Sequence, residues 1–137
     1  MIDPQLEANL DRTAAFRTQL RRYLHKTKTV TVAADLTPER YDLLLMVKAA
    51  ADSGDLATVG DLCESLDLKQ TAVTELVKRA EEAGLLARER SADDGRVYLL
   101  RLTAEGERRL RRVFDALAVE RAAFVETFQL LNDRFHA

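Results

Sequence analysis

The sequence contains few features of a secreted or membrane protein. Its single cysteine cannot form an internal disulfide bond. No apolar run approaches the roughly 20 residues that a membrane-spanning helix requires. The first residues, MIDPQLEANLDR, lack the basic and apolar regions of a signal peptide. We therefore expect a cytoplasmic protein with no membrane partner.

Candidates for catalysis and for metal binding are also scarce. His25 and His136 are the two histidines, and they lie too far apart in the sequence to suggest a metal cluster. The chain has no glycine-rich loop of the kind that cradles a phosphate, and no serine or threonine has the spacing of a nucleophile and its base. The sequence predicts no enzyme, no cofactor and no metal site.

The overall charge does not indicate a nucleic-acid partner. The 21 Lys and Arg residues against 23 Asp and Glu residues give a formal net charge of -2. Any electrostatic attraction to DNA would therefore have to arise locally. The length of 137 residues is that of one domain, so we expect a single domain over residues 1–137.

The beginning of the chain has a helical pattern. Asp3-Pro4 suits a helix start, because aspartate can cap free N–H groups and proline fits the first turn. A loose helical stripe of apolar residues follows: Leu6, Leu10, Phe16, Leu20, Tyr23 and Leu24. The segment 27–35, TKTVTVAAD, is rich in β-branched residues and is predicted to interrupt the helix.

Three further helix signals lie between residues 37 and 84. Thr37-Pro38 starts a second helix, which Asp52-Ser53-Gly54-Asp55 ends. Thr58 caps a short third helix, with Asp61 placed to complete a capping box. After a tight turn at 67–69, a fourth helix runs over residues 70–83, and Gly84 tolerates a left-handed stop.

The third and fourth helices each have an apolar face. The residues expected to be buried are Val59, Leu62, Cys63 and Leu66 on the third helix, and Val73, Leu76, Val77 and Ala80 on the fourth. Two short amphipathic helices joined by a tight turn predict a helix-turn-helix.

The stretch that follows alternates rather than repeating at helical spacing. Residues 85–90 and 97–102 can pair as two strands across the Asp93-Asp94-Gly95 turn. Thr103 is expected to cap a final helical region from Ala104 to about Phe135, as two helices or one bent helix. A helix-turn-helix followed by a hairpin makes a winged helix, so the predicted fold class is mainly α with a small β-hairpin. The charged hairpin tip can reach a phosphate backbone or a minor groove.

Seven residues are the candidates for DNA binding. Those on the polar face of the fourth helix are Gln70, Thr71, Thr74 and Lys78, and those on the hairpin are Arg88, Arg90 and Arg96. The alternative for each is a solvated surface. From Lys69 to Leu102 the chain has seven basic and six acidic side chains, a net charge of +1. Binding would therefore depend on which charges face the duplex.

Four other residues need their own interpretation. Glu75 lies on the same helix face, where DNA repels a carboxylate unless it accepts from a cytosine or pairs with Lys78 or Arg79. Asp93 and Asp94 are expected to close the turn and to orient Arg96 or Arg88 by an ion pair. Cys63 is predicted to be a buried packing residue of low reactivity, rather than a redox sensor.

Four segments, in this order and spacing, resemble the MarR family of winged-helix transcriptional regulators. They are Leu36-Thr37-Pro38, the helix-turn-helix from Asp61 to Gly84 with its Gly84-Leu85-Leu86 exit, Asp93-Asp94-Gly95-Arg96, and Leu102-Thr103-Ala104-Glu105-Gly106. The resemblance spans nearly the whole chain. It implies a winged-helix DNA-binding lobe over residues 36–103, flanked by dimerisation helices over 1–35 and 104–137.

The resemblance also implies partners. The family forms obligate homodimers whose two lobes bind a pseudo-palindromic site in double-stranded DNA, and its members often bind a small aromatic or phenolic effector between the lobe and the dimer helices. The candidate effector-binding residues are Phe16, Tyr23, His25 and Tyr41, with plain dimer core as the alternative.

The function expected is that of a dimeric, sequence-specific transcriptional repressor released by such an effector. The alternative is a winged-helix dimer with weak or lost DNA affinity that acts as a ligand- or protein-binding module. Glu75 and the near-neutral charge between Lys69 and Leu102 are the observations that favour this alternative.

Overall fold

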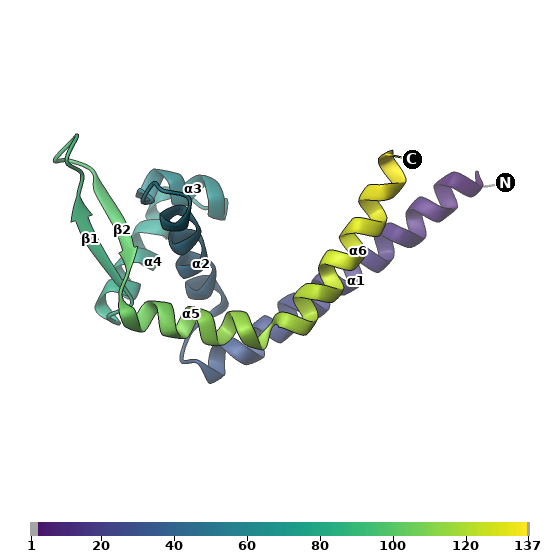
Figure 1. Cartoon of the computed structure of the whole chain (residues 1–137), viewed down its shortest axis with the longest axis horizontal. Helices are drawn as coiled ribbons and strands as arrows, with labels where there is room; N and C mark the ends of the chain where they lie inside the picture. The colour runs from purple at the N-terminus through teal and green to yellow at the C-terminus, as the bar shows by residue number, and fades with distance from the viewer. Residues whose placement is uncertain (1–2, 137) are drawn as a thin grey trace. The chain divides into compact units, whose positions relative to one another are not determined.

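The structure, a computed structural model, describes residues 3–136 and the side chains up to Asp133. The chain divides into two compact units. We call Thr31–Val113 the lobe, and residues 1–30 together with 114–137 the helical pair. Within the described residues there are six helices and one two-stranded antiparallel sheet, so the predicted fold class is confirmed (Figure 1).

Helix α1 (Pro4–Ala33) begins as predicted but ends later than expected. The backbone N–H of Gln5 donates to Asp3 Oδ1 over 3.1 Å at its start. The predicted interruption at 27–35 is wrong, because α1 continues to Ala33. The hydroxyl of Thr27 donates to the Tyr23 carbonyl over 2.7 Å, and Thr27 and Thr31 are both buried. Burial of the two threonines outweighs the weak helix propensity of β-branched residues, and the bond to Tyr23 satisfies the buried hydroxyl of Thr27.

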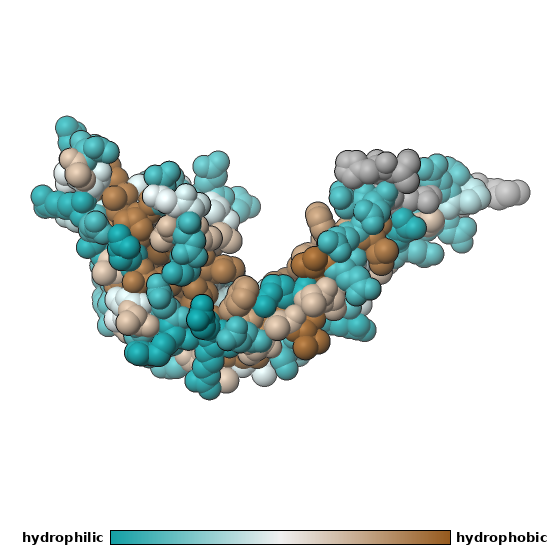
Figure 2. All heavy atoms as spheres, in the orientation of Figure 1, coloured by the Kyte–Doolittle hydropathy of each residue, from teal (hydrophilic) through white to brown (hydrophobic). Residues whose placement is uncertain are grey.

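Helices α1 and α6 (Ala118–His136) lie side by side in the helical pair. The ring of Phe16 packs against Phe124, with 5.2 Å between ring centroids, and against Phe128 at 6.2 Å. Tyr23 also packs against Phe124, at 5.9 Å. Part of the apolar surface of this unit is left exposed (brown in Figure 2). The exposed apolar side chains of the unit include Leu6, Leu10, Leu24, Val119, Val125, Phe128 and Leu130.

The three helices that open the lobe have the predicted ends. In α2 (Pro38–Asp52), the hydroxyl oxygen of Thr37 accepts from the backbone N–H of Arg40 over 3.1 Å. In α3 (Val59–Leu66), Thr58 and Asp61 form the capping box, each side chain accepting from the other's backbone N–H. Helix α4 covers Gln70–Glu82. These local signals are confirmed because each is satisfied within four residues.

The lobe core is formed by apolar side chains from every one of its elements. Those that are fully buried include Leu43, Leu44, Val47, Leu62, Val73, Val77, Leu85, Leu100 and Val113. Four residues expected to be buried are only half-buried: Val59, Cys63, Leu66 and Leu76. The prediction that Cys63 is buried is therefore wrong, because α3 has two turns and Leu62 is its one buried residue.

The hairpin consists of β1 (Leu86–Arg90) and β2 (Tyr98–Leu102). They pair antiparallel, with Leu86 opposite Leu102 and Arg90 opposite Tyr98. Leu86, Leu100 and Leu102 are buried at its base, and Figure 2 shows hydrophobic atoms beside the hairpin and hydrophilic atoms at its tip.

The base of the hairpin meets the start of α5 (Ala104–Ala116) at what we call the hairpin joint, which consists of Gly84, Leu85, Thr103 and Gly106. Gly84 ends the α4 segment with a φ of +75°. Thr103 donates from its backbone N–H to the Leu85 carbonyl over 3.0 Å, and from its hydroxyl to the Gly84 carbonyl over 2.6 Å. The same hydroxyl oxygen accepts from the backbone N–H of Gly106 over 3.0 Å, which caps α5 as predicted.

Gly106 is required at the hairpin joint, because a Cβ atom there would overlap the carbonyl oxygen of Leu85. We expect Gly106→Ala to lower the free energy of unfolding by about 1–3 kcal/mol, as overpacked core substitutions do, although alanine is the better helix former. Urea denaturation of the purified protein measures this change.

Gly60→Ala is the matched control for that substitution. A Cβ at position 60, also on a helix, would meet only Thr58 Oγ1 at an ordinary 3.6 Å. We expect this variant to be as stable as the wild type, or more stable by up to about 1 kcal/mol. Equal stabilities for the two variants would contradict the close approach of α5 to Leu85.

Candidate nucleic-acid interface

Helix α4 has one buried face and one exposed face. Val73, Val77 and Ala80 are buried, and the candidate residues Gln70, Thr71, Thr74 and Lys78 are all exposed. Their side chains carry amide, hydroxyl and ammonium groups, which suit base edges and phosphates. The structure thus places these four predicted residues together on one surface.

The start of α4 differs from the starts of α2 and α3. Lys69 occupies the N-cap position and makes no side-chain capping bond, whereas Thr37 and Thr58 cap the other two helices. The first N–H groups of a helix have no partner within the helix and carry partial positive charge. The start of α4 therefore has the chemistry that an anion needs.

Glu75 is paired with a neighbour on its own helix. Its Oε1 atom lies 2.9 Å from Arg79 Nε, one helical turn away. The sequence allowed either Lys78 or Arg79 as the partner of Glu75, and the structure shows Arg79. The pair is exposed, so it contributes only a few tenths of a kcal/mol, but it offsets the negative charge on the polar face of α4.

The tip of the hairpin, residues 91–97, is closed by short polar side chains. The hydroxyl oxygen of Ser91 accepts from the backbone N–H groups of Asp93 and Asp94. Asp94 Oδ1 accepts from the backbone N–H of Arg96 over 3.0 Å and lies 4.0 Å from Arg96 Nε. The turn-closing role predicted for Asp94 is therefore confirmed. The side chain of Arg96 is 96% exposed, so its guanidinium projects into solvent.

Arg88 and Arg90 differ in their surroundings. Arg88 Nε lies 2.6 Å from Glu81 Oε1, an ion pair that joins β1 to the last turn of α4. We call this pair the wing brace. Both guanidinium groups also lie over the ring of Tyr98, at 5.6 Å for Arg88 and 5.7 Å for Arg90. Arg88 thus holds the hairpin against α4.

The brace and Tyr98 were not found from the sequence. Neither Glu81 nor Tyr98 is among the residues that the sequence analysis singles out. The predicted strand pairing contained a signal for Tyr98, because residues opposite one another on paired strands share a face. The brace joins residues seven apart in different elements, so only the structure could show it.

The four candidate effector residues fall into different surroundings. Phe16 and Tyr23 pack against Phe124 in the helical pair, and Tyr41 is buried in the lobe core. His25 lies on a shallow groove of about 540 Å³ in the helical pair. Basic, acidic and apolar side chains all line the groove: Gln19, Arg21, Arg22, His25, Lys26, Val119, Glu120 and Ala123.

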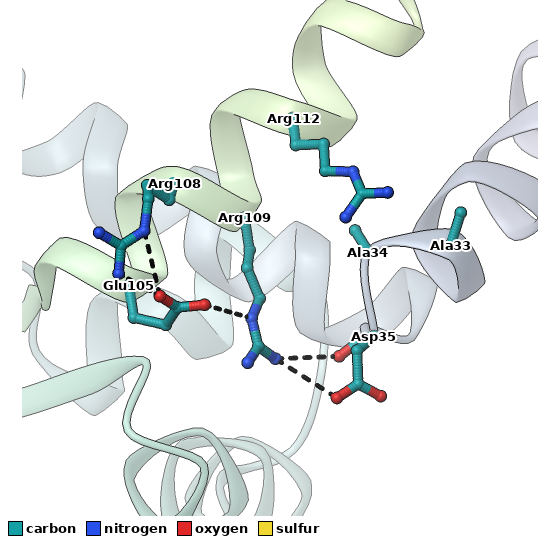
Figure 3. Close-up of a pocket in the computed structure, with 7 residues that line it drawn as sticks. All are labelled: Ala33, Ala34, Asp35, Glu105, Arg108, Arg109 and Arg112. Atoms are coloured by element: carbon teal, nitrogen blue, oxygen red, sulfur yellow. Dashed lines mark hydrogen bonds and ion pairs between the residues drawn. The ribbon is translucent and has the colours of Figure 1, made fainter.

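A second concavity, within the lobe, lies between the end of α1 and the first turns of α5 (Figure 3). Its basic residues come from α5 and include Arg109, which pairs with Glu105 at 2.9 Å and donates to the Asp35 carbonyl over 3.3 Å. Arg108 and then Arg109 hold the pKa of the Glu105 carboxyl below its ordinary value. Asp35 has a left-handed backbone, with φ of 56°. Arg109 therefore caps the turn that ends α1, which has no basic residue in its own last turn.

Up to Asp133, no group of three His, Cys, Asp or Glu side chains is arranged to hold a metal ion. Every helix within residues 3–136 is too short or too polar to span a membrane.

The lobe, in which α3 packs on α4 and α4 contacts β1 of the hairpin, defines a winged helix-turn-helix protein. The family model described as "MarR family" matches residues 34–97. The match lies within the lobe and covers 64 of the 137 residues, and it confirms the sequence resemblance to the MarR family.

Two curated relatives are regulators by description. The putative transcriptional regulatory protein for the hcr operon of Thauera aromatica is 28% identical over 101 residues, which are 74% of this chain and 58% of that protein. The uncharacterized HTH-type transcriptional regulator YdgJ of Bacillus subtilis is 31% identical over 75 residues, 55% of this chain and 43% of that protein. The chain thus spans about half the length of the curated relatives it matches.

Solved structures show the same fold. The apo form of MarR from E. coli has a TM-score of 0.69 at 19% identity, covering 97% of this chain and 85% of that one. The MepR–DNA complex of S. aureus has a TM-score of 0.68 at 21% identity, covering 83% of this chain and 82% of that one. At these identities the likeness establishes the fold.

The wing brace generates a stability prediction. Because the Arg88 and Glu81 side chains are 38% and 27% exposed, we expect Glu81→Gln and Arg88→Gln each to lower the free energy of unfolding. A double-mutant cycle should give a coupling energy near the upper end of the surface range, about 1 kcal/mol.

The Glu89–Arg101 pair on the opposite face of the hairpin is the control for this cycle. Its side chains are 53% and 57% exposed and lie 3.4 Å apart. Solvent should screen it more, so its coupling energy should be smaller. If the two cycles give the same coupling energy, the wing brace does not hold the hairpin against α4.

Proposed function

We propose that the protein is a sequence-specific DNA-binding transcriptional regulator. The observation that carries this proposal is the pairing, in one lobe, of an exposed polar face on α4 with a hairpin tip whose Arg96 is 96% exposed. The two features match the two surfaces of a duplex that a winged helix contacts. A recognition helix enters the major groove, and a wing reaches the adjacent backbone or minor groove.

Each candidate residue has a role in this proposal. Gln70, Thr71, Thr74 and Lys78 contact base edges and phosphates in the major groove. The uncapped start of α4 binds a backbone phosphate through its N–H groups. Arg90 contacts the backbone and Arg96 the backbone or minor groove, whereas Arg88 acts through the wing brace. Two observations support the proposal: both relatives are described as transcriptional regulators, and the similar structure of MepR was solved as a complex with DNA.

A homodimer joined through the N- and C-terminal helices is part of the same proposal. The helical pair leaves apolar side chains such as Leu10, Val125 and Phe128 exposed, and exposed apolar surface of this kind suits a protein interface. Two lobes would then bind a pseudo-palindromic site with two-fold symmetry.

Repression relieved by a small aromatic or phenolic effector completes the proposal. The groove beside His25 is lined by basic side chains such as Arg22 and Lys26 and by the apolar Val119 and Ala123, so it has the chemistry to bind such a molecule when it carries an acidic group. An effector that prefers the conformation unsuited to DNA would lower DNA affinity by its differential affinity for the two conformations.

The salt dependence of binding tests the wing. The wild-type protein should bind duplex DNA, with log K falling linearly against log salt concentration. Arg96→Ala should weaken binding to specific and unrelated DNA by similar factors, and should reduce the slope by about 0.9 for each chain bound if Arg96 neutralises one phosphate. Fluorescence anisotropy at several salt concentrations measures both. Salt-insensitive or absent binding by the wild type would favour the alternative of a ligand- or protein-binding module.

The helix should respond differently from the wing. Thr74 is neutral and exposed on the polar face of α4, so Thr74→Ala should leave the salt slope and non-specific binding unchanged. It should weaken binding to the operator by about 1–3 kcal/mol for each base pair recognised. Titration with the DNA that flanks the gene, beside a scrambled duplex of the same composition, makes the comparison. A uniform loss on both duplexes would show that Thr74 contacts only the backbone.

A further inference from the structure

Tyr98 occupies an unusual position on the outer half of the hairpin. The strand register places it directly opposite Arg90 and diagonal to Arg88. These three residues share a hairpin face with Leu86, Leu100 and Leu102, which are buried at the base. This face therefore changes along its length from apolar side chains at the base to one tyrosine and two arginines towards the tip.

The tyrosine ring is held by charged neighbours and remains accessible. Guanidinium carbons lie 5.6 Å and 5.7 Å from its centroid, within the range of cation–π attraction. Tyr98 is 38% exposed, so its hydroxyl group is not enclosed by the core. The ring restrains the Arg90 side chain, which would otherwise lose rotamer entropy when it bound a ligand.

The hydrogen bonding of the pair leaves donors free. Arg90 Nη2 donates to the Tyr98 hydroxyl oxygen over a long 3.5 Å. Because the oxygen accepts this bond, the phenolic hydrogen is left to donate elsewhere. The remaining N–H groups of Arg90 are also donors, since a guanidinium has five. Two side chains with spare donors thus meet at one exposed point.

Arg90 also differs from its neighbours in its ion pairing. Arg88 is paired with Glu81, and Arg101 on the opposite face is paired with Glu89. Among the side chains described up to Asp133, no carboxylate forms an ion pair with Arg90. Of the two arginines on this hairpin face, Arg88 is already neutralised by Glu81, so Arg90 is the one whose positive charge a ligand can neutralise.

We propose that Tyr98 and Arg90 together form a clamp for one backbone phosphate of DNA. A phosphate oxygen accepts from the phenolic O–H of Tyr98 and from an N–H of Arg90, while the ring holds Arg90 in position. This inference rests on the proposed DNA-binding function and adds Tyr98 to its contacts. The clamp reads no base, because both of its donors bind phosphate oxygens.

Two substitutions separate the parts of the clamp. Tyr98→Phe keeps the ring and removes the hydroxyl, so it should weaken binding by about tenfold, the effect of losing one hydrogen bond to a charged group. The salt slope should not change, because tyrosine is neutral. Arg90→Gln should weaken binding and reduce the slope by about 0.9 for each chain bound. The double variant should lose less than the product of the two single factors, since both act on one phosphate.

The experiment uses the full-length protein and a mixed-sequence DNA duplex, titrated at several salt concentrations. Arg101→Gln is the matched control, because it removes one positive charge from the same hairpin on the face away from Tyr98. It should leave the slope unchanged. Thermal denaturation of each variant checks that the fold is kept.

The outcomes distinguish this inference from the function on which it rests. A wild-type protein that binds no duplex overturns both. A wild-type protein that binds, with Tyr98→Phe at full affinity, overturns the role of the tyrosine and leaves DNA binding in place. Equal slope changes for Arg90→Gln and Arg101→Gln overturn the clamp as well, because the charge effect would then not depend on the face.

Discussion

At the hairpin joint, the carbonyl groups of Gly84 and Leu85 accept hydrogen bonds from Thr103. These two bonds fix the chain that leaves α4 to the chain that enters α5, and they close the base of the hairpin. They need a helix start that can approach a carbonyl closely, which Gly106 provides. Helix α4 ends just before the joint, and the two strands of the hairpin leave from it and return to it. The joint therefore fixes the end of α4 relative to the base of the hairpin.

The parts of the fold that could be predicted from the sequence are those with local causes. The capping box of Thr58 and Asp61, the cap at Thr37 and the left-handed Gly84 each involve residues that are close in sequence. The hairpin was predicted because alternation and its turn residues lie within one short stretch. The exposed face of α4 followed from its helical period.

The errors have long-range or competing causes. The β-branched segment from Thr27 to Thr31 was assigned to a break, yet burial of both threonines keeps it helical. Cys63 was expected in the core, but its burial depends on which elements pack against α3, and the sequence of α3 alone does not show this. The near-neutral charge of residues 69–102 was also ambiguous, because a count does not reveal which acidic groups are paired. Glu75, Glu81 and Glu89 each pair with an arginine in the structure.

The wing brace also has a mechanical consequence. A β-ribbon fixed at its base behaves as a cantilever, whose deflection grows with its unsupported length. Because Arg88 ties the ribbon to α4 partway along β1, only the portion beyond residue 88 is free to bend. Shortening the free portion stiffens it, so the position of Arg96 is tied to the orientation of α4. The spacing between the polar face of α4 and Arg96 therefore depends on the wing brace, on the backbone hydrogen bond from Leu100 to Ala57 at the same register, and on the stiffness of a short ribbon.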